Sequence, residues 1–345
     1  MKLNISFLFS SFFAVLVFCL SFNCNNNNNS INLNMNKINI VPKPTKITPG
    51  KGSVDLALVE KIIVSKNDDS EIKVAKLIQA LLSPIRDLSI ETSQSKTDNS
   101  IFIVIDDQGD LPQEGYSLSI GGENAIELRS SSYSGFFYGH QSLRQLCGPE
   151  LEKGNKPKTA LIPKVDIVDE PMFGYRGMHL DVSRHFFDIN FIKTYIDMIA
   201  LHKMNVFHWH LTDDNGWRIE IDGYPLLAEK SAWRVDRTGE PWKEQSPAKK
   251  NEKATYGGYY TKDDIREVVE YAANRNIMVI PEIEMPGHTS EVFAAYPELS
   301  CKGELIPVNP GSYWPNVDIF CAGRDEVFAF LENVLDEVME LFPGP

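Results

Sequence analysis

The sequence predicts a mixed α/β protein, with a small α+β unit in front and parallel strands linked by helices behind it. Two observations carry this prediction. The first part of the chain mixes helical periodicity with short strands that include a hairpin-like pair. Beyond residue 169 the order becomes strand, loop, helix, at a spacing suited to parallel strands with helical crossovers. Three such units in series fit either a doubly wound sheet or the first half of an eight-stranded barrel.

Composition excludes some partners. The chain has 345 residues, 43% of them hydrophobic, which is enough to build packed cores in two domains. Its formal net charge is −13. Binding to nucleic acid or anionic lipid needs clustered Lys and Arg that release counterions, so this charge argues against both partners. Neutral and weakly charged ligands remain open.

The start of the chain carries targeting features. The apolar stretch Ile5–Leu20 is somewhat shorter than the ~20 residues that a membrane-spanning helix needs. We therefore expect an export signal over residues 1–24 and a solvated, Asn-rich linker over residues 25–37. Cys19 or Cys24 could carry a lipid at the cleavage site. We expect contact with a membrane only if such a lipid anchor is present. The expected location is periplasmic, extracellular, or at the cell surface as a lipoprotein.

A small α+β domain is expected over residues 38–168. Its predicted strands are Lys61–Ser65, Ile101–Ile105, Tyr116–Ile120 and Ala125–Arg129, and its predicted helices are Ile72–Leu82 and Tyr133–Leu146. This region has no convergent cluster of titratable groups and none of the five Trp residues. We interpret it as a non-catalytic scaffold, with a boundary at Asp166–Pro171.

The second domain, residues 169–345, repeats strand, loop and helix. The predicted strands are Tyr175–Val182, Asn205–Leu211 and Ile277–Met285. The predicted helices run from the cap Asp188 to His202, from Asp263 to Arg275, and from Asp325 to Leu341. Thr261 and Asp264 have the spacing of a capping box, which marks the start of the middle helix.

Each of these three strands has one apolar and one polar face, because successive side chains point to opposite sides. The polar faces hold His179 and Asp181, His208 and His210, and Glu282 and Glu284. More polar residues follow in the loops Ser183–His185, Thr212–Asp214 and Pro286–His288. Active sites of parallel α/β folds lie at the carboxyl ends of the strands, so we predict a site at this edge. Capping of helices or bridging of strands is the structural alternative.

Residue type suggests individual roles at this edge. Arg184 has a planar fork of donors that suits two adjacent sugar hydroxyls, and a salt bridge to Asp181 or Asp213 is its alternative. Asp213 and His288 could form a carboxylate–imidazole pair that orients and tunes a catalytic acid, since a buried His takes its tautomer and charge from its partner. Their alternative role is a structural link between two loops.

The remaining candidates are less specific. Trp217 and Trp242 could present a face to a sugar ring, although an individual Trp is more often part of a core. Cys301 and Cys321 are disulfide candidates because export permits a bridge, with two unpaired cysteines as the alternative. Cys147 is expected to be a core thiol.

Three sequence blocks resemble one family when taken together. GYRGMHLDVSRHF is followed along the chain by NVFHWHLTDDNGWRIEIDGYPLL and then by IMVIPEIEMPGH. Their order, spacing and amino-acid sequences are similar to those of the β-N-acetylhexosaminidases of glycoside hydrolase family 20. The earlier segments VPKPTKI and SSYSGFFYGHQSLRQL resemble that family's non-catalytic N-terminal module. The resemblance covers most of Ile38–Pro345.

The resemblance implies an α/β fold with a catalytic (β/α)₈ TIM-type barrel, here truncated and preceded by the small α+β domain. It implies removal of terminal β-linked N-acetylglucosamine or N-acetylgalactosamine from N-acetylated oligosaccharides or glycoconjugates. The implied mechanism is retaining and substrate-assisted, because the acetamide oxygen of the substrate replaces the usual carboxylate nucleophile. No metal or cofactor is implied. Asp213 and His288 become the supporting catalytic pair, and the expected substrate contacts are Arg184, Asp181, Asp214, Glu284 and Trp217.

One feature departs from the family's pattern. The family carries its acid Glu and its acetamide-orienting Asp in a His-Xaa-Gly-Gly-Asp-Glu motif on the fourth strand, after a helix like Asp325–Leu341. This sequence contains no such motif. Asp325-Glu326 opens a predicted helix and Asp336-Glu337 lies within it, and neither pair is preceded by the two glycines. We therefore expect an incomplete barrel domain that is inactive on its own.

Two other functions stay open. His208 and His210 share a strand face and could bind a metal together with Asp213, as in barrel metallohydrolases. Stoichiometric zinc would favour that function. The missing motif also fits a non-catalytic glycan-binding protein, which would fold stably and keep its affinity for N-acetyl sugars.

Overall fold

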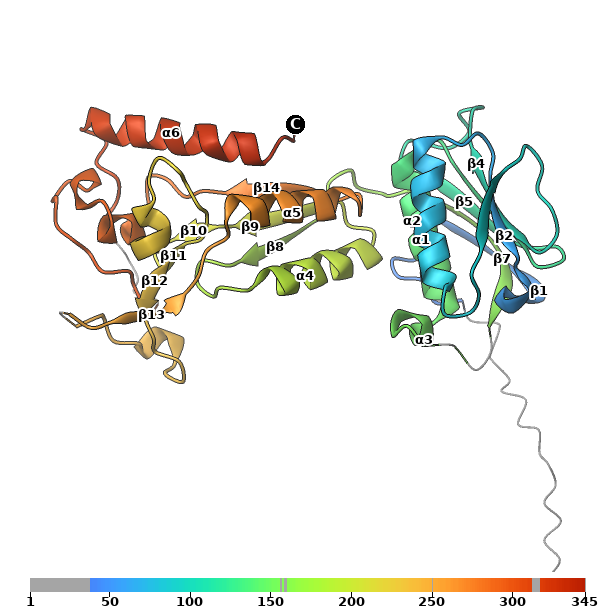
Figure 1. The fold of residues 1–345 in the computed structure, drawn as a ribbon, viewed down its shortest axis with the longest axis horizontal. Coiled ribbons are helices and arrows are strands. Elements are labelled where there is room, and N and C mark those ends of the chain that lie inside the picture. Colours follow the sequence, from blue (N-terminus) through green and yellow to red (C-terminus); the bar gives the residue numbers. More distant parts are fainter. Residues whose placement is uncertain (1–37, 156, 158–159, 250, 312–316, 345) are drawn as a thin grey trace, which may run out of the picture. The chain divides into compact units, whose positions relative to one another are not determined.

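A seven-stranded mixed sheet, with two long helices against it, forms the first part of the described chain (Figure 1). The strand order is β1-β7-β5-β6-β4-β2-β3. The pairs from β1 to β6 are antiparallel, and those from β6 to β3 are parallel. The elements are β1 (Lys46–Asp55), β2 (Lys61–Val64), α1 (Asp69–Leu82), β3 (Ser89–Thr92), β4 (Ser100–Ile105), β5 (Tyr116–Gly121), β6 (Ala125–Ser130), α2 (Tyr133–Cys147), α3 (Pro149–Glu152) and β7 (Leu161–Asp169).

This computed structural model describes residues 38–155, 157, 160–249, 251–311 and 317–344. The predicted export signal, the Asn-rich linker and the two cysteines at the start of the chain lie outside the described residues. In the part of the chain that is described, no helix combines the length and the apolar character that crossing a membrane requires.

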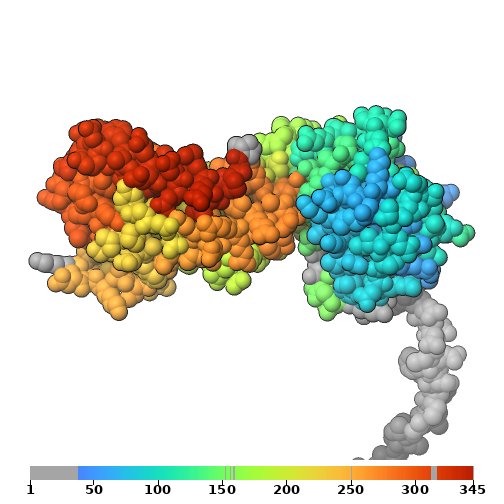
Figure 2. Space-filling model, turned by 45° about the horizontal axis from the view of Figure 1, so that its top comes forward, coloured from blue at the N-terminus to red at the C-terminus, as the bar shows by residue number. Residues whose placement is uncertain are grey.

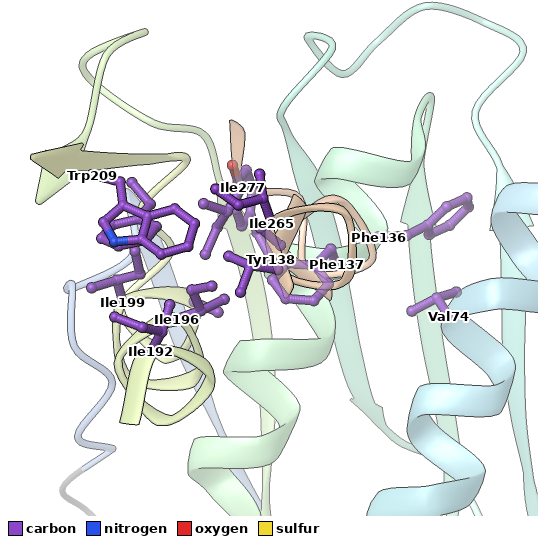
Figure 3. Packing of buried hydrophobic residues seen from close by; sticks show 14 of the residues in the cluster. Val74, Phe136, Phe137, Tyr138, Ile192, Ile196, Ile199, Trp209, Ile265 and Ile277 are labelled. Atoms are coloured by element: carbon purple, nitrogen blue, oxygen red, sulfur yellow. The ribbon is translucent and has the colours of Figure 1, made fainter. Parts of the chain in front are cut away.

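Local sequence explains how the two helices pack on this sheet. The Asp68 side chain caps α1, and Glu71 completes a capping box. Close packing of α2 depends on its glycines, since a Cβ at Gly139 would come within 2.3 Å of the Leu128 side chain. Val74 of α1 and Phe136 of α2 are fully buried side by side in the core (Figure 3). The four strands and two helices predicted here are confirmed, while β1, β3 and β7 were not predicted.

The second sheet is parallel, with the strand order β14-β9-β8. It consists of β8 (Gly177–Asp181), β9 (Val206–His210) and β14 (Met278–Glu282), and its helices are α4 (Ile189–Leu201), α5 (Lys262–Ala273) and α6 (Asp325–Leu341). The pairing register places Asp181, His210 and Glu282 in one row across the three strands. The predicted order of strands and helices is therefore confirmed.

Helices cover the apolar face of this parallel sheet. Trp209 on β9 is fully buried, and Ile192, Ile196 and Ile199 of α4 lie near it (Figure 3). The helix starts follow the predicted caps, because the Asp188 side chain accepts from the backbone N–H of Phe191 and a capping box precedes α5. The caps set where α4 and α5 begin, and the buried residues of each helix hold it against the sheet.

Helix α6 has one buried and one open side. It appears in red along the molecular surface in Figure 2. Val334 and Phe330 are buried, whereas Phe328 is 51% and Met339 63% exposed. Apolar side chains of α6 therefore remain accessible on the side away from the core.

Two small hairpins and several single turns build the long segment between β9 and α5 and the segment after β14. The hairpins pair β10 (Thr212–Asp213) with β11 (Gly216–Trp217) and β12 (Trp233–Val235) with β13 (Ala254–Gly257). The turns are η1 (Leu56–Leu58), η2 (Leu227–Ser231), η3 (Trp242–Glu244), η4 (Ser290–Ala294) and η5 (Pro297–Leu299), of which η1 precedes β2.

The cysteines outside the start of the chain have separate roles. Cys301 and Cys321 form a disulfide that closes the segment between η5 and α6, as one of the two sequence alternatives proposed. Cys147 lies at the end of α2 and packs against the core of the first sheet.

Candidate active site

Polar side chains from the three parallel strands meet at the carboxyl end of the sheet. Asp181 ends β8, His210 ends β9 and Glu282 ends β14, and the register aligns all three. The loops that follow these strands supply Arg184, Asp213 and His288. Successive parallel strands therefore deliver these groups to one edge, as the sequence predicted.

Asp213 lies at the centre of the group. Its side chain is 1% exposed, and its carboxylate lies 2.6 Å from Arg184 Nη2, 3.2 Å from His288 Nδ1 and 3.3 Å from His210 Nε2. His288 has a φ of 56°, in the left-handed region, and its ring is 41% exposed. One buried carboxylate thus holds a guanidinium and two imidazoles that come from the loops or ends of three strands. The predicted Asp213–His288 pair is present.

Arg184 forms salt bridges with both Asp181 and Asp213, which the sequence analysis gave as the alternative to a role in sugar binding. Its Nη1 donates to Asp181 at 2.8 Å and its Nη2 contacts Asp213 at 2.6 Å. Asp181 also accepts from the backbone N–H groups of Ser183 and Arg184. A guanidinium has five donors, and the Arg184 side chain is 31% exposed. The ion pairs therefore orient Arg184 and still leave it able to bind a ligand.

Asp214 and Glu284 lie in the same cluster. Asp214 accepts from the backbone N–H and the hydroxyl of Ser290, and its other oxygen is 3.4 Å from His288 Nδ1. Glu284 Oε1 lies 3.6 Å from His210 Nε2. Burial, with the charges of Asp213 and Glu282, raises the pKa of Glu284. The structure brings these two predicted residues to the site, and their contact with substrate stays a prediction.

Trp217 is a correction to the predicted site. Its side chain is 1% exposed, and its indole N–H donates to the carbonyl of Ile219. A ring that is enclosed in the core has no face for a sugar, so the prediction of a substrate contact at Trp217 was wrong. Trp242 is only half-buried, and its ring centroid lies 5.3 Å from that of His185.

Three imidazoles surround Glu282 on the polar face of the sheet. Its Oε2 lies 2.7 Å from His208 Nε2 and 3.7 Å from both His179 Nε2 and His210 Nδ1. In the described part of the chain, three groups could hold a metal at this edge: His179 with His210 and Glu282, His210 with Asp213 and Glu284, and Asp213 with Asp214 and His288. The set suggested by the sequence is not among them, because His208 is paired with Glu282 instead.

His210 is expected to titrate above its ordinary pKa, and His179 below it. Burial disfavours the His210 imidazolium, but Asp213, Asp181 and Glu282 outweigh burial and raise its pKa. Burial, with the charges of His208 and His210, lowers the pKa of His179. Protonated His210 therefore contributes stability that is complete below the unfolded pKa of about 6.5 and is lost as pH rises through its folded pKa.

Titration of the ring protons by NMR measures both values in one sample, with His179 as the internal control. A pKa for His210 at or below that of His179 would contradict the ion-pair arrangement around Asp213.

Sequence reasoning missed the residue that holds these loops together. Arg218 follows β11 and is fully buried. Its guanidinium donates to the backbone carbonyls of Val182, Ser183, Asn215, Ala232 and Gly258. The guanidinium fits only because residue 216 is a glycine, since a Cβ at Gly216 would lie 2.3 Å from it. The available signal was a single basic residue between the apolar residues Trp217 and Ile219.

Glu291 is a second buried group that the sequence did not single out. Its carboxyl is fully buried in η4, next to the loop that carries His288. Burial, reinforced by the charge of Asp214, raises its pKa well above the ordinary value. Burial therefore favours the protonated form of Glu291 beneath the site.

The geometry defines the class first. A parallel sheet whose strand ends gather an arginine, carboxylates and imidazoles belongs to the α/β proteins that bind ligands at the carboxyl edge. The model of "Glycosyl hydrolase family 20, catalytic domain" matches residues 173–345, and that of "Glycosyl hydrolase family 20, domain 2" matches residues 37–170. The chain therefore belongs to glycosyl hydrolase family 20, and its parallel sheet is part of a TIM-type barrel rather than of a doubly wound sheet.

Individual relatives agree with the family. The chain is 41% identical over 314 residues to a β-hexosaminidase of Porphyromonas gingivalis, covering 89% of this chain and 38% of that protein. It is 40% identical over 244 residues to a β-hexosaminidase of Vibrio furnissii, covering 70% of this chain and 38% of that protein. This chain thus spans well under half the length of these two relatives.

Solved structures also match. A GH20 β-N-acetylhexosaminidase from Streptomyces coelicolor A3(2) superposes with a TM-score of 0.77 at 33% identity, covering 88% of this chain and 58% of that one. A Streptomyces plicatus β-hexosaminidase variant in complex with its product GlcNAc superposes with a TM-score of 0.77 at 33% identity, covering 88% and 57%. These matches extend over both the mixed sheet and the parallel sheet.

Proposed function

We propose that this chain is the front part of an exo-acting β-N-acetylhexosaminidase, which removes terminal β-linked N-acetylglucosamine or N-acetylgalactosamine. The observation that carries the proposal is the buried Asp213 carboxylate, which joins Arg184 and His288 at one edge of a family 20 barrel sheet. Relatives named β-hexosaminidase, and a solved relative that holds GlcNAc, support the substrate class.

Each residue has a proposed role. The donors of Arg184 that face away from its two ion pairs bind hydroxyls of the terminal sugar. Asp213 fixes both Arg184 and His288, and the Asp213–His288 pair orients the catalytic acid. Asp181, Asp214 and Glu284 complete the polar surround of the sugar.

The proposed reaction is substrate-assisted and retaining. The acetamide oxygen of the sugar attacks the anomeric carbon while a Glu protonates the leaving oxygen, and water then opens the cyclic intermediate. An Asp beside that Glu orients the acetamide. Because the sequence has no His-Xaa-Gly-Gly-Asp-Glu motif, we expect residues 1–345 alone to bind sugar without hydrolysing it.

Export is the second part of the proposal. The apolar stretch Ile5–Leu20 and the Asn-rich segment behind it are typical of a signal followed by a spacer. An enzyme delivered in this way would act on N-acetylated oligosaccharides or glycoconjugates outside the cytoplasm.

A paired assay tests the function. The 345-residue chain and a version extended through further barrel strands are incubated with a chromogenic N-acetylglucosaminide. We expect hydrolysis only in the extended version. Hydrolysis by the 345-residue chain would refute our account of the acid, and no hydrolysis by either would refute the proposed activity. Sugar binding without hydrolysis in both would favour a glycan-binding protein, and stoichiometric zinc would favour a metallohydrolase.

A further inference from the structure

Two imidazoles and a carboxylate meet on the polar face of the parallel sheet, and the proposed reaction gives them no role. His179, His210 and Glu282 come from the three neighbouring strands β8, β9 and β14 (Figure 1). One possible ligand atom from each residue lies within 4.8 Å of the other two. Two His and one Glu are a ligand set of catalytic zinc sites, in which water fills the fourth position. The cluster is therefore a candidate site for a transition-metal ion.

The spacing of the three groups suits such an ion. Zinc lies about 2.0–2.1 Å from a nitrogen or oxygen ligand, so two ligands at the tetrahedral angle lie roughly 3.3 Å apart. Glu282 Oε2 lies 3.7 Å from His179 Nε2 and 3.7 Å from His210 Nδ1. Small rotations of the side chains therefore bring all three groups to bonding distance from one ion.

The Glu282 carboxylate has an oxygen that a cation would satisfy. Its Oε2 is buried, and in the described part of the chain it accepts no hydrogen bond of normal geometry. A buried polar atom of this kind needs another partner, such as an ion. His208 Nε2 lies 2.7 Å from the same oxygen. His208 can therefore act as the outer partner that orients a ligating Glu282.

His210 also has an outer partner in place. Histidines that bind metals usually donate their other ring N–H to a carboxylate, which fixes the tautomer and the orientation of the ring. His210 Nδ1 faces Glu282, and His210 Nε2 lies 3.3 Å from the buried Asp213 carboxylate. The His210 side chain is only 6% exposed. Its ring is therefore held with one nitrogen toward the cluster and the other toward Asp213.

Access and ligand type select the ion. The side chains of His179 and Glu282 are 48% and 30% exposed, so an ion can reach the cluster from the open side of the sheet. Imidazole nitrogens suit zinc, whereas Mg²⁺ prefers an octahedral shell of oxygen atoms. The cluster should therefore bind zinc in preference to magnesium.

We propose that His179, His210 and Glu282 form a zinc site on the polar face of the parallel sheet. His208 and Asp213 are its outer partners. The inference goes beyond the proposed function, because no step of sugar hydrolysis uses the ion. A zinc ion held by these residues connects β8, β9 and β14 and fixes His210 against Asp213. It thereby braces the strand ends that carry the sugar site.

Calorimetric titration of the 345-residue chain with zinc chloride tests the site. We expect one bound zinc ion per chain and no comparable binding of magnesium chloride. His179→Gln should weaken zinc binding about tenfold or more, because even the loss of an outer partner has an effect of this size. His202→Gln is the matched control, since His202 is exposed at the end of α4 and contacts only the carbonyl of Met198 among the described residues. The control should bind zinc as the wild type does.

Two further measurements on the unchanged chain do not depend on how a variant folds. Cobalt(II) in this site should show the visible absorption of an ion with few ligands, and zinc should displace it. Zinc should also raise the urea concentration at which the chain unfolds. At about 100 times its dissociation constant, a ligand of the folded state multiplies the ratio of folded to unfolded chain about hundredfold.

Absence of zinc binding overturns the inference, and so does zinc binding that His179→Gln leaves unchanged. The second result would place the ion in one of the other two groups at this edge, which both contain Asp213. No sugar is present in these titrations, so the zinc site and the proposed function can fail separately. A metallohydrolase would need its zinc for hydrolysis. Under our inference, a chelator removes the zinc and leaves hydrolysis by the extended version intact.

Discussion

Replacing Arg218 by Met is expected to lower the free energy of unfolding by about 3–5 kcal/mol, because the change leaves a group of buried carbonyls without a donor. The guanidinium is fully buried and donates to the backbone of Val182, Ser183, Asn215, Ala232 and Gly258. Burial, with the charge of Arg234, lowers its pKa to about 10, so it remains protonated at neutral pH. Its loss should also loosen the loop that carries Arg184.

Urea denaturation followed by circular dichroism measures this loss. Arg218→Lys should be nearly as destabilising as Arg218→Met, since one ammonium group cannot reach carbonyls in four separate segments of the chain. Arg266→Met is the control, because Arg266 is exposed on α5 and pairs with Asp263 one turn away. That control should change stability by less than about 0.5 kcal/mol. If Arg218→Met came within 1 kcal/mol of the wild type, the carbonyls would be satisfied in another way.

Helix starts and strand faces of the second domain were visible in the sequence because both depend on neighbours in the chain. Asp188 caps α4 and the Thr261–Asp264 pair caps α5, as the local spacing required. The polar faces of the strands followed from strict alternation, and the parallel register then aligned Asp181 with His210. Short-range rules therefore sufficed to place the polar groups at one edge.

Strands of the first sheet were missed where those rules fail. The β1 strand contains Pro49, and its pairing with β7 shifts register between Pro49 and Ser53, so its alternation is broken. The β7 strand runs through the expected boundary at Asp166–Pro171 and ends only at Asp169. The β3 strand is a short edge strand with no fully buried residue. Pairing with distant strands, which no local pattern shows, defines all three.

The errors within the site have the same origin. Trp217 and Arg218 come shortly after the polar run Thr212–Asp214, so their positions were equally compatible with a ligand contact and with the core. The β10–β11 hairpin folds this segment back and encloses both side chains in the core. Whether such a residue faces a ligand or the interior depends on how this hairpin packs against the rest of the domain. The contacts among Arg184, Asp213 and His288 were predictable because each residue comes soon after the carboxyl end of its parallel strand.

Asp213→Asn is expected to weaken N-acetylglucosamine binding at least tenfold, because Arg184 and His288 lose the carboxylate that fixes both of them. Removing one partner of a fully buried ion pair costs about 3–5 kcal/mol, and we expect about 2 kcal/mol here since Arg184 is nearly one-third exposed. The pKa of His210 should fall in the same variant, because Asp213 contributes to raising it. Calorimetry, urea denaturation and NMR titration measure these three effects.

Asp222→Asn is the matched control for this last prediction. Asp222 pairs with Lys262 at the surface, with a side chain 74% exposed, so its loss should change stability by less than about 0.5 kcal/mol and leave sugar affinity unchanged. The decisive comparison is between affinity and stability in Asp213→Asn. Unchanged affinity together with lower stability would make the Asp213–His288 pair a structural link between two loops. Loss of affinity, with the fold retained, would assign it to the binding of the terminal sugar.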